Sequence, residues 1–247
     1  MNRFFLPENL IKHGEVNFPE EIAHQILRVL RLKSGDSVHV LDNQGFIYNV
    51  LLQVDTAMGR VSGTVVERTP VKTEPRVFLA LYFGLTTREK TEFILQKGTE
   101  IGISAFAPVI STRTLVQSDE LSAKRRTRWE KIICEAAEQS YRGRLPILNV
   151  PKGFEDGITD AINQHDLALI AWEGAVSDQN SLKNMVSQDG LTRIALFVGP
   201  EGGFSEEEIA LASAKACQVV LLGKRILRME TAAILLPGLV LFALGEM

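Results

Sequence analysis

The chain has 247 residues, of which 45% are hydrophobic and 23% are charged. These ordinary globular values exclude disorder as the main state and leave enough apolar residues for a sizeable core in one or two domains. Two cysteines exclude a disulfide framework, and no apolar run approaches the ~20 residues of a membrane-spanning helix. The N-terminus has only a three-residue apolar stretch, so we expect no signal peptide and a reducing, cytoplasmic compartment.

The net charge of −3 conceals an uneven distribution along the chain. Residues 71–150 hold 13 basic and 9 acidic residues, whereas residues 151–247 hold 7 basic and 13 acidic residues. A basic middle segment beside an acidic end is compatible with a nucleic-acid-binding surface on an acidic protein. A solvated helix face explains the same charges, and charge alone favours that interpretation.

The first seventy residues predict a small, mostly β unit with one helix near its start. The helix begins at Pro19 and has an apolar side at helical spacing, formed by Ile22, Ile26 and Val29. Short β-type runs follow at residues 37–41, 46–54 and 60–66. Short strands this closely spaced are typical of a small barrel, and the proline-containing stretch 69–75 is the predicted domain boundary.

From Arg76 onward, short apolar runs alternate with helical stretches. The predicted strands cover residues 77–83, 105–110, 167–172, 194–198 and 219–222. The predicted helices cover residues 86–101, 121–141, 154–163, 181–186, 205–215 and 231–244. Nearly continuous apolar runs fit strands that are buried on both faces, so the pattern predicts a mostly parallel sheet covered by helices.

Two loops that follow predicted strands carry the residues that suggest a ligand site, because ligands of parallel sheets bind at the carboxyl ends of strands. The first loop, residues 199–204, holds three glycines before a helix that Ser205 and Glu208 cap. Glycines let backbone groups approach a ligand closely. The second loop, residues 223–232, places two arginines and a lysine beside an apolar pair, which suits one apolar ligand face and one anionic partner. Plain turns without a ligand are the alternative for both loops.

The motifs of several other enzyme classes are absent from the sequence. It contains no P-loop, no G-x-G-x-x-G dinucleotide fingerprint and no G-x-S-x-G nucleophile elbow. The four histidines show no metal-ligand spacing, so we expect no metal site. These absences argue against a P-loop nucleotidase and an ordinary Rossmann enzyme.

Basic residues form a pattern on the predicted first helix. His24, Arg28 and Arg31 recur at i, i+4 and i+7, so they should share one helix face. We expect them to contact phosphates, because aligned cationic groups repel one another without an anion. The basic residues of the predicted helix 121–141 are better interpreted as a solvated face.

Taken together, these motifs resemble the RsmE family of 16S ribosomal RNA (uridine-N3) methyltransferases, which belong to the SPOUT class. The resemblance extends over essentially the whole chain. Its specific motifs are Gly199–Gly203 and Leu222–Ala232, and weaker matches occur at residues 24–31, 96–102 and 138–142. Two positions depart from the family pattern: Lys224 stands where the family usually has proline, and Pro237 interrupts the final predicted helix and its expected dimer contact.

The resemblance implies an α/β protein with a PUA-like RNA-binding barrel over residues 1–70. It implies a SPOUT α/β-knot domain over residues 74–247, with a C-terminal trefoil knot that binds S-adenosylmethionine, and a homodimer. The implied reaction is methyl transfer to N3 of uridine-1498 in the decoding region of 16S ribosomal RNA, with the free RNA or the small ribosomal subunit as partner. The alternatives are a SPOUT methyltransferase acting on another rRNA or tRNA site, and a non-catalytic RNA-binding module.

The expected site residues fall into three groups. Arg228 is the first choice for stabilising the negative charge that develops on the uracil, and Glu230 would accept a proton, orient Arg228 or brace the loop. The expected cofactor-binding residues are Gly199, Pro200, Glu201, Gly202, Leu222, Gly223, Ile226, Leu227 and Thr231. A structural role is the alternative for Glu201. The expected RNA-binding residues are His24, Arg28, Arg31, Arg88, Arg142 and Arg225.

Overall fold

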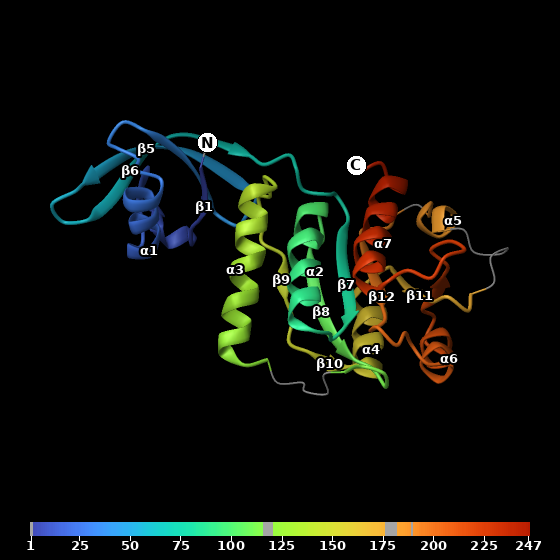
Figure 1. Ribbon diagram of the computed structural model, residues 1–247. Coiled ribbons are helices and arrows are strands. Elements are labelled where there is room, and N and C mark those ends of the chain that lie inside the picture. The colour runs from blue at the N-terminus through green and yellow to red at the C-terminus, as the bar shows by residue number, and fades with distance from the viewer. Residues whose placement is uncertain (1, 116–120, 176–181, 189) are drawn as a thin grey trace. The chain divides into compact units, whose positions relative to one another are not determined.

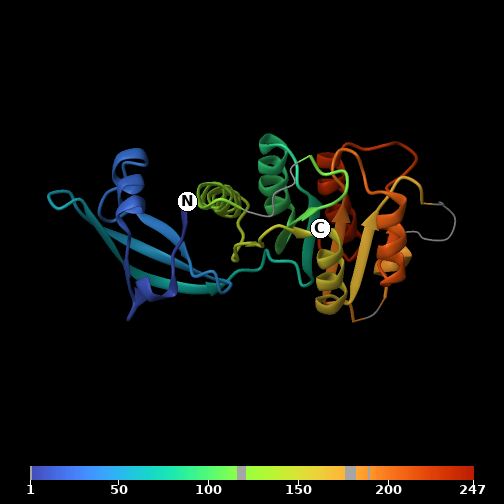
Figure 2. The same ribbon diagram turned by 90° about the horizontal axis from the view of Figure 1, so that it is seen from below.

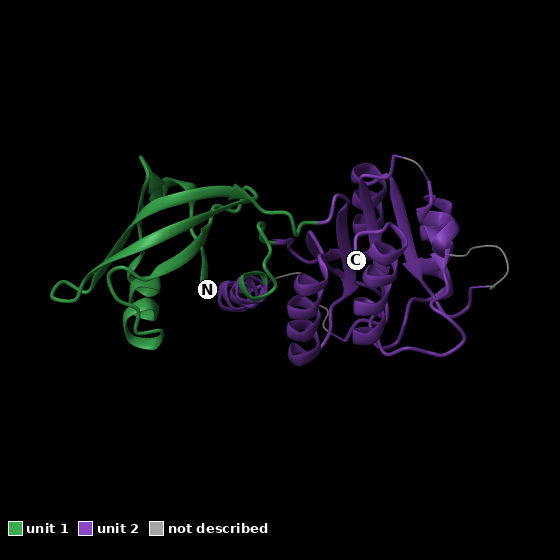
Figure 3. Cartoon of the chain, turned by 90° about the horizontal axis from the view of Figure 1, so that it is seen from above, with its two compact units in different colours: residues 1–74, 137–145 green, residues 75–136, 146–247 purple. Residues whose placement is uncertain are grey.

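The computed structural model describes residues 2–115, 121–175, 182–188 and 190–247 (Figure 1). The chain divides into two compact units (Figure 3). Unit 1 comprises residues 1–74 and 137–145, and unit 2 comprises residues 75–136 and 146–247. The predicted boundary near residues 70–74 assigned everything after it to one domain, whereas the structure returns residues 137–145 to unit 1.

Unit 1 is built on a curled six-stranded sheet in the order β1-β4-β5-β6-β3-β2. Its strands are β1 (Arg3–Phe5), β2 (Ile11–Lys12), β3 (Glu15–Asn17), β4 (Ser37–Leu41), β5 (Phe46–Asp55) and β6 (Arg60–Pro70). β1 pairs parallel with β4, and the other neighbours pair antiparallel. The sequence predicted β4, β5 and β6 but missed the others, because strands of two or three residues are too short to show alternation. Within the described residues β1 and β2 do not pair with each other, and the PUA-like barrel stays a prediction.

The helical segment of unit 1 departs from the predicted α-helical spacing. After a 3-10 turn, η1 (Glu8–Leu10), and strands β2 and β3, the short helix α1 (Glu20–His24) continues into a π-helical turn, η2 (Gln25–Val29). Ile26 is fully buried as predicted, but Val29 is 67% exposed because the wider turn rotates it off the apolar side. Arg31 lies beyond the helix with a φ of 56°. The prediction that His24, Arg28 and Arg31 share one α-helical face is therefore wrong, although all three side chains are exposed.

Unit 2 contains a seven-stranded sheet in which every pairing is parallel. The strand order is β10-β8-β7-β12-β11-β13, and β9 pairs with β8. The strands are β7 (Phe78–Gly84), β8 (Ala105–Ile110), β9 (Ile147–Leu148), β10 (Lys152–Gly153), β11 (Leu167–Ala171), β12 (Arg193–Val198) and β13 (Gln218–Val220). All five predicted strands are confirmed, and the two-residue strands β9 and β10 were missed.

Helices cover both faces of this sheet, as Figure 2 shows for α2 and α7 on one side and α4 and α6 on the other. The helices are α2 (Arg88–Ile101), α3 (Ala123–Gln139), α4 (Phe154–Gln164), α5 (Leu182–Val186), α6 (Glu206–Ala214) and α7 (Met229–Ala243). On β7, Leu81 and Phe83 point into the core with α2 and α7, and Tyr82 points into the core with α4 and α6. Burial on both faces explains why these strands are continuous apolar runs.

The last helix, α7, is continuous through Pro237. Pro237 is buried, and the helix does not end there as the sequence suggested it could. Three apolar side chains stay exposed at i, i+4 and i+7: Leu235 at 38%, Leu239 at 37% and Phe242 at 71%. They form one outward stripe on the helix. None of the helices in the described segments has both the length and the apolar character of a membrane span.

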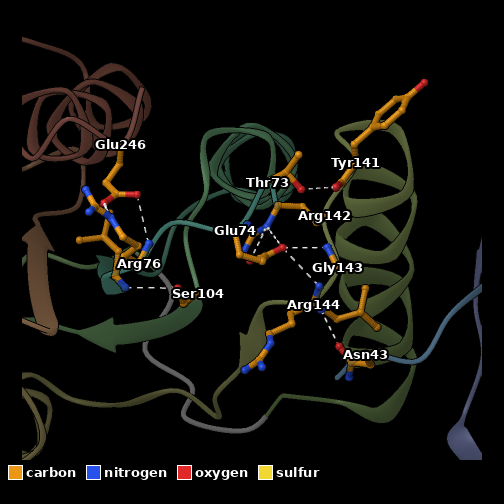
Figure 4. A network of polar contacts seen from close by, with 12 residues as sticks. Asn43, Thr73, Glu74, Arg76, Ser104, Tyr141, Arg142, Gly143, Arg144 and Glu246 are labelled. Carbon is orange, nitrogen blue, oxygen red and sulfur yellow. Dashed lines mark hydrogen bonds and ion pairs between the residues drawn. The ribbon is translucent and has the colours of Figure 1, made fainter. Parts of the chain in front are cut away.

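Glu74 holds residues 137–145 within unit 1 (Figure 4). Its carboxylate accepts hydrogen bonds from the Arg142 guanidinium, the closest at 2.8 Å, and from the backbone N–H groups of Gly143 at 2.8 Å and Arg144 at 3.3 Å. Arg142 is only 3% exposed. The expectation that Arg142 binds RNA is therefore contradicted, because its guanidinium is buried against Glu74.

We expect Glu74→Gln to loosen residues 137–145. Burial raises the pKa of Glu74, but the hydrogen bonds from Arg142, Gly143 and Arg144 outweigh burial and hold that pKa below its ordinary value. A carboxylate with a lowered pKa stabilises the folded state above its unfolded-state pKa, and this contribution is lost as the pH falls. Removing a hydrogen-bonded charge should accelerate hydrogen exchange at the Gly143 and Arg144 amides about tenfold or more at neutral pH.

Glu135→Gln is the matched control, because Glu135 is an exposed residue of α3 whose one ion pair with a described residue, Lys131, spans 3.9 Å. Its effect on amide protection should be negligible. The protection lost in Glu74→Gln should shrink toward zero on acidification. Equal protection in the parent protein and Glu74→Gln at neutral pH would contradict the role of Glu74.

Candidate functional site

The carboxyl ends of β11, β12 and β13 surround a pocket of about 400 Å³. These strands are neighbours in the sheet, so the loops that follow them meet at one edge. The loops after β12 and β13 were predicted as ligand loops from the sequence. The segment after β11 was not, because chain order conceals that β11 lies between the other two strands.

Most of the predicted cofactor-binding residues line this pocket. They are Gly199, Pro200, Glu201, Gly202, Leu222, Gly223, Ile226 and Leu227. Thr231 is not among the lining residues and is exposed. α7 starts at Met229, and Met229 and Ala232 face the pocket. Since an α-helix turns by about 100° per residue, Thr231 points away from the side of α7 that carries Met229 and Ala232, and its contact with the cofactor stays a prediction.

The glycine-containing loop, residues 199–204, packs closely against the end of β7. A Cβ atom on Gly84 would lie 2.4 Å from the backbone nitrogen of Pro200, so only glycine allows this approach. Within the loop, the Gly203 N–H donates to the Pro200 carbonyl at 2.9 Å, and Gly203 has a φ of 67°. Arg113 Nη1 donates to the Gly202 carbonyl at 2.9 Å. Contacts within the protein therefore determine the conformation of this loop.

The helix that follows the loop begins with the predicted capping box. The Glu208 N–H donates to Ser205 Oγ at 3.2 Å, and the Ser205 N–H donates to Glu208 Oε2 at 2.8 Å. The other carboxylate oxygen of Glu208 accepts from the Thr112 N–H at 2.8 Å. The buried Glu208 thereby joins the start of α6 to the segment after β8.

Lys90 of α2 supplies a cation to the pocket that the sequence analysis did not single out. Its Nζ lies 3.1 Å from Glu201 Oε1 and 3.7 Å from Glu230 Oε2. Glu201 Oε1 also accepts a hydrogen bond from the Thr86 hydroxyl. Burial raises the pKa of Glu201, but the hydrogen bonds from Thr86 and Lys90 outweigh burial, so the pKa is lowered. Glu201 is thus an ionised brace of the loop, which was the alternative interpretation of this residue.

The two arginines of the second loop lie at the pocket. Arg225 and Arg228 line it, are exposed, and form no ion pair with any residue that the structure describes. The Arg228–Glu230 pair considered from the sequence does not form, since Glu230 faces Lys90 instead. Glu230 Oε2 is buried and has no hydrogen-bond partner in the described part of the chain. The pocket therefore offers two guanidinium groups that have no ion-pair partner among the described residues, whereas Glu230, beside Lys90, is not one of its lining residues.

Trp172 and Glu173 complete the pocket wall after β11. A Cβ on Gly174 would lie 2.4 Å from the Trp172 indole, so the ring occupies the space over this glycine. The Glu173 carboxylate approaches Gly203, where a Cβ would lie 3.3 Å from Oε1. A signal for both residues was present, because Trp172-Glu173-Gly174 follows an apolar run as the two recognised loops do.

The remaining predicted RNA-binding residues are exposed but differ in their surroundings. Arg88 Nε lies 2.9 Å from Glu92 Oε1, whereas Arg225 is at the pocket. His24, Arg28 and Arg31 belong to unit 1. Their contact with RNA stays a prediction. No group of three or more His, Cys, Asp or Glu side chains suited to a metal ion occurs in the described residues.

The family model of the RNA methyltransferase domain matches residues 73–241. The ribosomal RNA small subunit methyltransferase E of Bacillus subtilis (strain 168) is 34% identical over 241 residues, which cover 94% of this chain and 93% of that relative. The protein of the same description from Synechocystis sp. is 36% identical over 229 residues, or 92% of this chain and 72% of that relative.

Two solved structures similar to this chain contain S-adenosylmethionine. The ribosomal RNA small subunit methyltransferase E of Neisseria gonorrhoeae, bound to S-adenosylmethionine, has a TM-score of 0.86 and is 30% identical, with 98% of this chain and 97% of that chain covered. A putative methyltransferase from Legionella pneumophila, in complex with the same cofactor, has a TM-score of 0.84 and is 26% identical, with 98% of each chain covered.

Proposed function

The chain belongs to the RNA methyltransferase family and, within it, to the ribosomal RNA small subunit methyltransferase E group, and from this membership we propose that it methylates N3 of a uridine in 16S ribosomal RNA. The proposed methyl donor is S-adenosylmethionine, and the proposed target is uridine-1498. The observation that carries the proposal is the pocket at the ends of β11, β12 and β13, where a glycine loop adjoins Arg228, which has no ion-pair partner among the described residues.

The residues of the pocket fit S-adenosylmethionine. Ile226 is 87% exposed, and Leu222 and Leu227 are half-buried, so the loop after β13 presents apolar surface that an adenine ring would cover. The glycines of residues 199–203 carry no side chains, so polar atoms of a ligand can approach the backbone groups that the Gly203–Pro200 and Arg113–Gly202 hydrogen bonds leave unused. When bound, S-adenosylmethionine supplies a methyl group that its sulfonium already activates.

The side chains around the pocket supply the remaining chemistry. Uracil N3 carries a proton and becomes nucleophilic only when that proton leaves, so negative charge develops on the uracil. The unpaired guanidinium of Arg228 stabilises this charge, and Glu230 accepts the proton. The protein otherwise contributes mainly the position of the two substrates.

We assign RNA binding to residues 1–70, as a PUA-like barrel, and methyl transfer to residues 74–247, with the ligand loops in a trefoil knot. The exposed cations proposed to contact RNA are His24, Arg28, Arg31, Arg88 and Arg225. Their proposed partner is 16S RNA, free or within the small ribosomal subunit of the cytoplasm. Phosphate contacts of this kind would make binding salt-dependent.

The test of the function is mass spectrometry of RNA incubated with the protein and S-adenosylmethionine. Free 16S RNA and small ribosomal subunits, each lacking the modification, are the two substrates. We expect 3-methyluridine at uridine-1498 in at least one of them. Methylation of tRNA alone, of a ribose, or of another base atom would contradict the proposal, as would RNA binding without any methylation.

Arg228→Ala should lower the single-turnover rate at saturating RNA and cofactor by ~10²–10³, as removal of one donor to a developing oxyanion does. Arg228→Lys should restore little, because an ammonium cannot match the planar guanidinium. Arg225→Ala is the comparison, and it should weaken RNA binding while the saturated rate survives. A near-parental saturated rate for Arg228→Ala would rule out its catalytic role.

We propose a homodimer in which the exposed stripe of α7 is covered by a second copy. Leu235, Leu239 and Phe242 form a continuous apolar stripe on an almost wholly apolar helix, and water is a poor environment for it. Light scattering at micromolar concentration should give a dimer for the parent protein and a monomer for the double variant Leu239→Glu/Phe242→Glu. Val66→Glu, at an exposed apolar residue of β6, should remain dimeric. A monomeric parent protein would contradict the proposal.

A further inference from the structure

Lys90 joins three elements that are far apart in the sequence. It belongs to α2, Glu201 lies in the loop after β12, and Glu230 lies in the first turn of α7. The single ammonium group lies 3.1 Å from Glu201 Oε1 and 3.7 Å from Glu230 Oε2. Its side chain is 32% exposed and lines the pocket, so it acts where the two substrates would meet.

The two ion pairs of Lys90 are not equivalent. The pair with Glu201 is a hydrogen bond, and Thr86 holds the same carboxylate independently. The pair with Glu230 exceeds hydrogen-bonding distance, and Glu230 Oε2 is buried without a hydrogen-bond partner among the described residues. A buried acceptor without a partner costs free energy, so this oxygen is open to a further donor.

The position of Glu230 also matters for Arg228. A carboxylate paired with Arg228 would neutralise the positive charge that the uracil needs. In the structure Glu230 is turned toward Lys90, and Arg228 forms no ion pair with a described residue. The Lys90 ammonium attracts the Glu230 carboxylate, and no described carboxylate occupies the Arg228 guanidinium, so each group is available for a separate task.

We propose that Lys90 is a positioning residue for methyl transfer, which holds the Glu230 carboxylate toward itself and away from Arg228, where Glu230 takes the N3 proton. This inference rests on the proposed function. In the proton-transfer step the N3–H bond breaks, its electron pair stays on N3, and the proton forms an O–H bond with a Glu230 oxygen. Water removes that proton after turnover, which regenerates the carboxylate.

The first experiment compares Lys90→Met and Lys90→Arg with Lys97→Met. Lys97 lies on the same helix and has its own carboxylate partner, Glu100, at 2.7 Å, which makes it a matched control. Lys90→Met should lower the saturated single-turnover rate about tenfold or more, Lys90→Arg should recover most of the loss, and Lys97→Met should change nothing. Lys90→Gln replaces Lys90→Met if the latter does not fold.

Two measurements that need no turnover separate a positioning role of Lys90 from a purely structural role. The dissociation constant of S-adenosylhomocysteine, measured by calorimetry, should rise no more than about threefold in Lys90→Met, because Thr86 still holds Glu201. Hydrogen exchange of the first-turn amides of α7 should accelerate in Lys90→Met and not in Lys97→Met. Loss of S-adenosylhomocysteine binding with an unchanged saturated rate would overturn the proposal.

A double-mutant cycle then tests whether Lys90 acts through Glu230. In a Glu230→Gln background, Lys90→Met should lower the rate by less than about twofold, whereas in a Glu201→Gln background its full effect should persist. A full Lys90→Met effect in the Glu230→Gln background would overturn the inference, as would a parental rate for Lys90→Met. If the parent protein methylates 16S RNA, these outcomes leave the proposed function intact. A parent protein without methylation activity would overturn both.

Discussion

The parallel pairing of β11 with both β12 and β13 is the constraint on which the site depends. Leu169 of β11 is in register with Leu196 on one side and with Gln218 on the other, so the carboxyl ends of the three strands reach one edge together. The faces of these strands are covered by helices and carry apolar side chains. Polar chemistry is thereby confined to the strand ends, where the loops can present glycines, carboxylates and guanidinium groups around one volume.

Close packing positions the loops around the pocket, and charged side chains determine its electrostatic character. Because Gly84 has no side chain, Pro200 packs directly against the end of β7, and this van der Waals contact fixes the position of the loop 199–204. The carboxylates of Glu201 and Glu230 share the single ammonium of Lys90, whereas Arg225 and Arg228 have no compensating carboxylate among the described residues. The charge is therefore negative toward α2, where one ammonium faces two carboxylates, and positive on the second loop, which would attract an anion.

Much of this arrangement could be predicted from local sequence patterns. The Ser205–Glu208 capping box and the five longer parallel strands depend on residues close together in the sequence, and the structure confirms them. The two predicted ligand loops line one pocket, and their binding of a ligand stays a prediction. Recognition of family motifs added the cofactor and the reaction, which no periodicity could indicate.

The errors have a common physical origin in contacts between distant segments. Arg142 resembled an RNA-binding residue until Glu74, 68 positions earlier, was found to bury its charge. Lys90 was overlooked because its partners lie on other elements, and Glu173 because the sheet inserts β11 between strands that follow it in the chain. A helical repeat of 3.6 residues predicted that Val29 lies on the apolar side and Arg31 on the basic face of the helix, and both predictions are wrong. A π-helical turn changes the repeat, and no sequence pattern indicated this turn.

The return of residues 137–145 to unit 1 has a consequence for how such a chain can be divided. The backbone passes between the units three times, at residues 74–75, 136–137 and 145–146. If the chain were cut after Glu74, the C-terminal piece would keep residues 137–145. That piece would lose the carboxylate that pairs with Arg142 and the sheet against which these residues pack. The first 74 residues therefore do not make up the whole of unit 1. A gene fusion or recombination event that replaced only these residues would have to supply another sheet and another carboxylate for residues 137–145 to pack against.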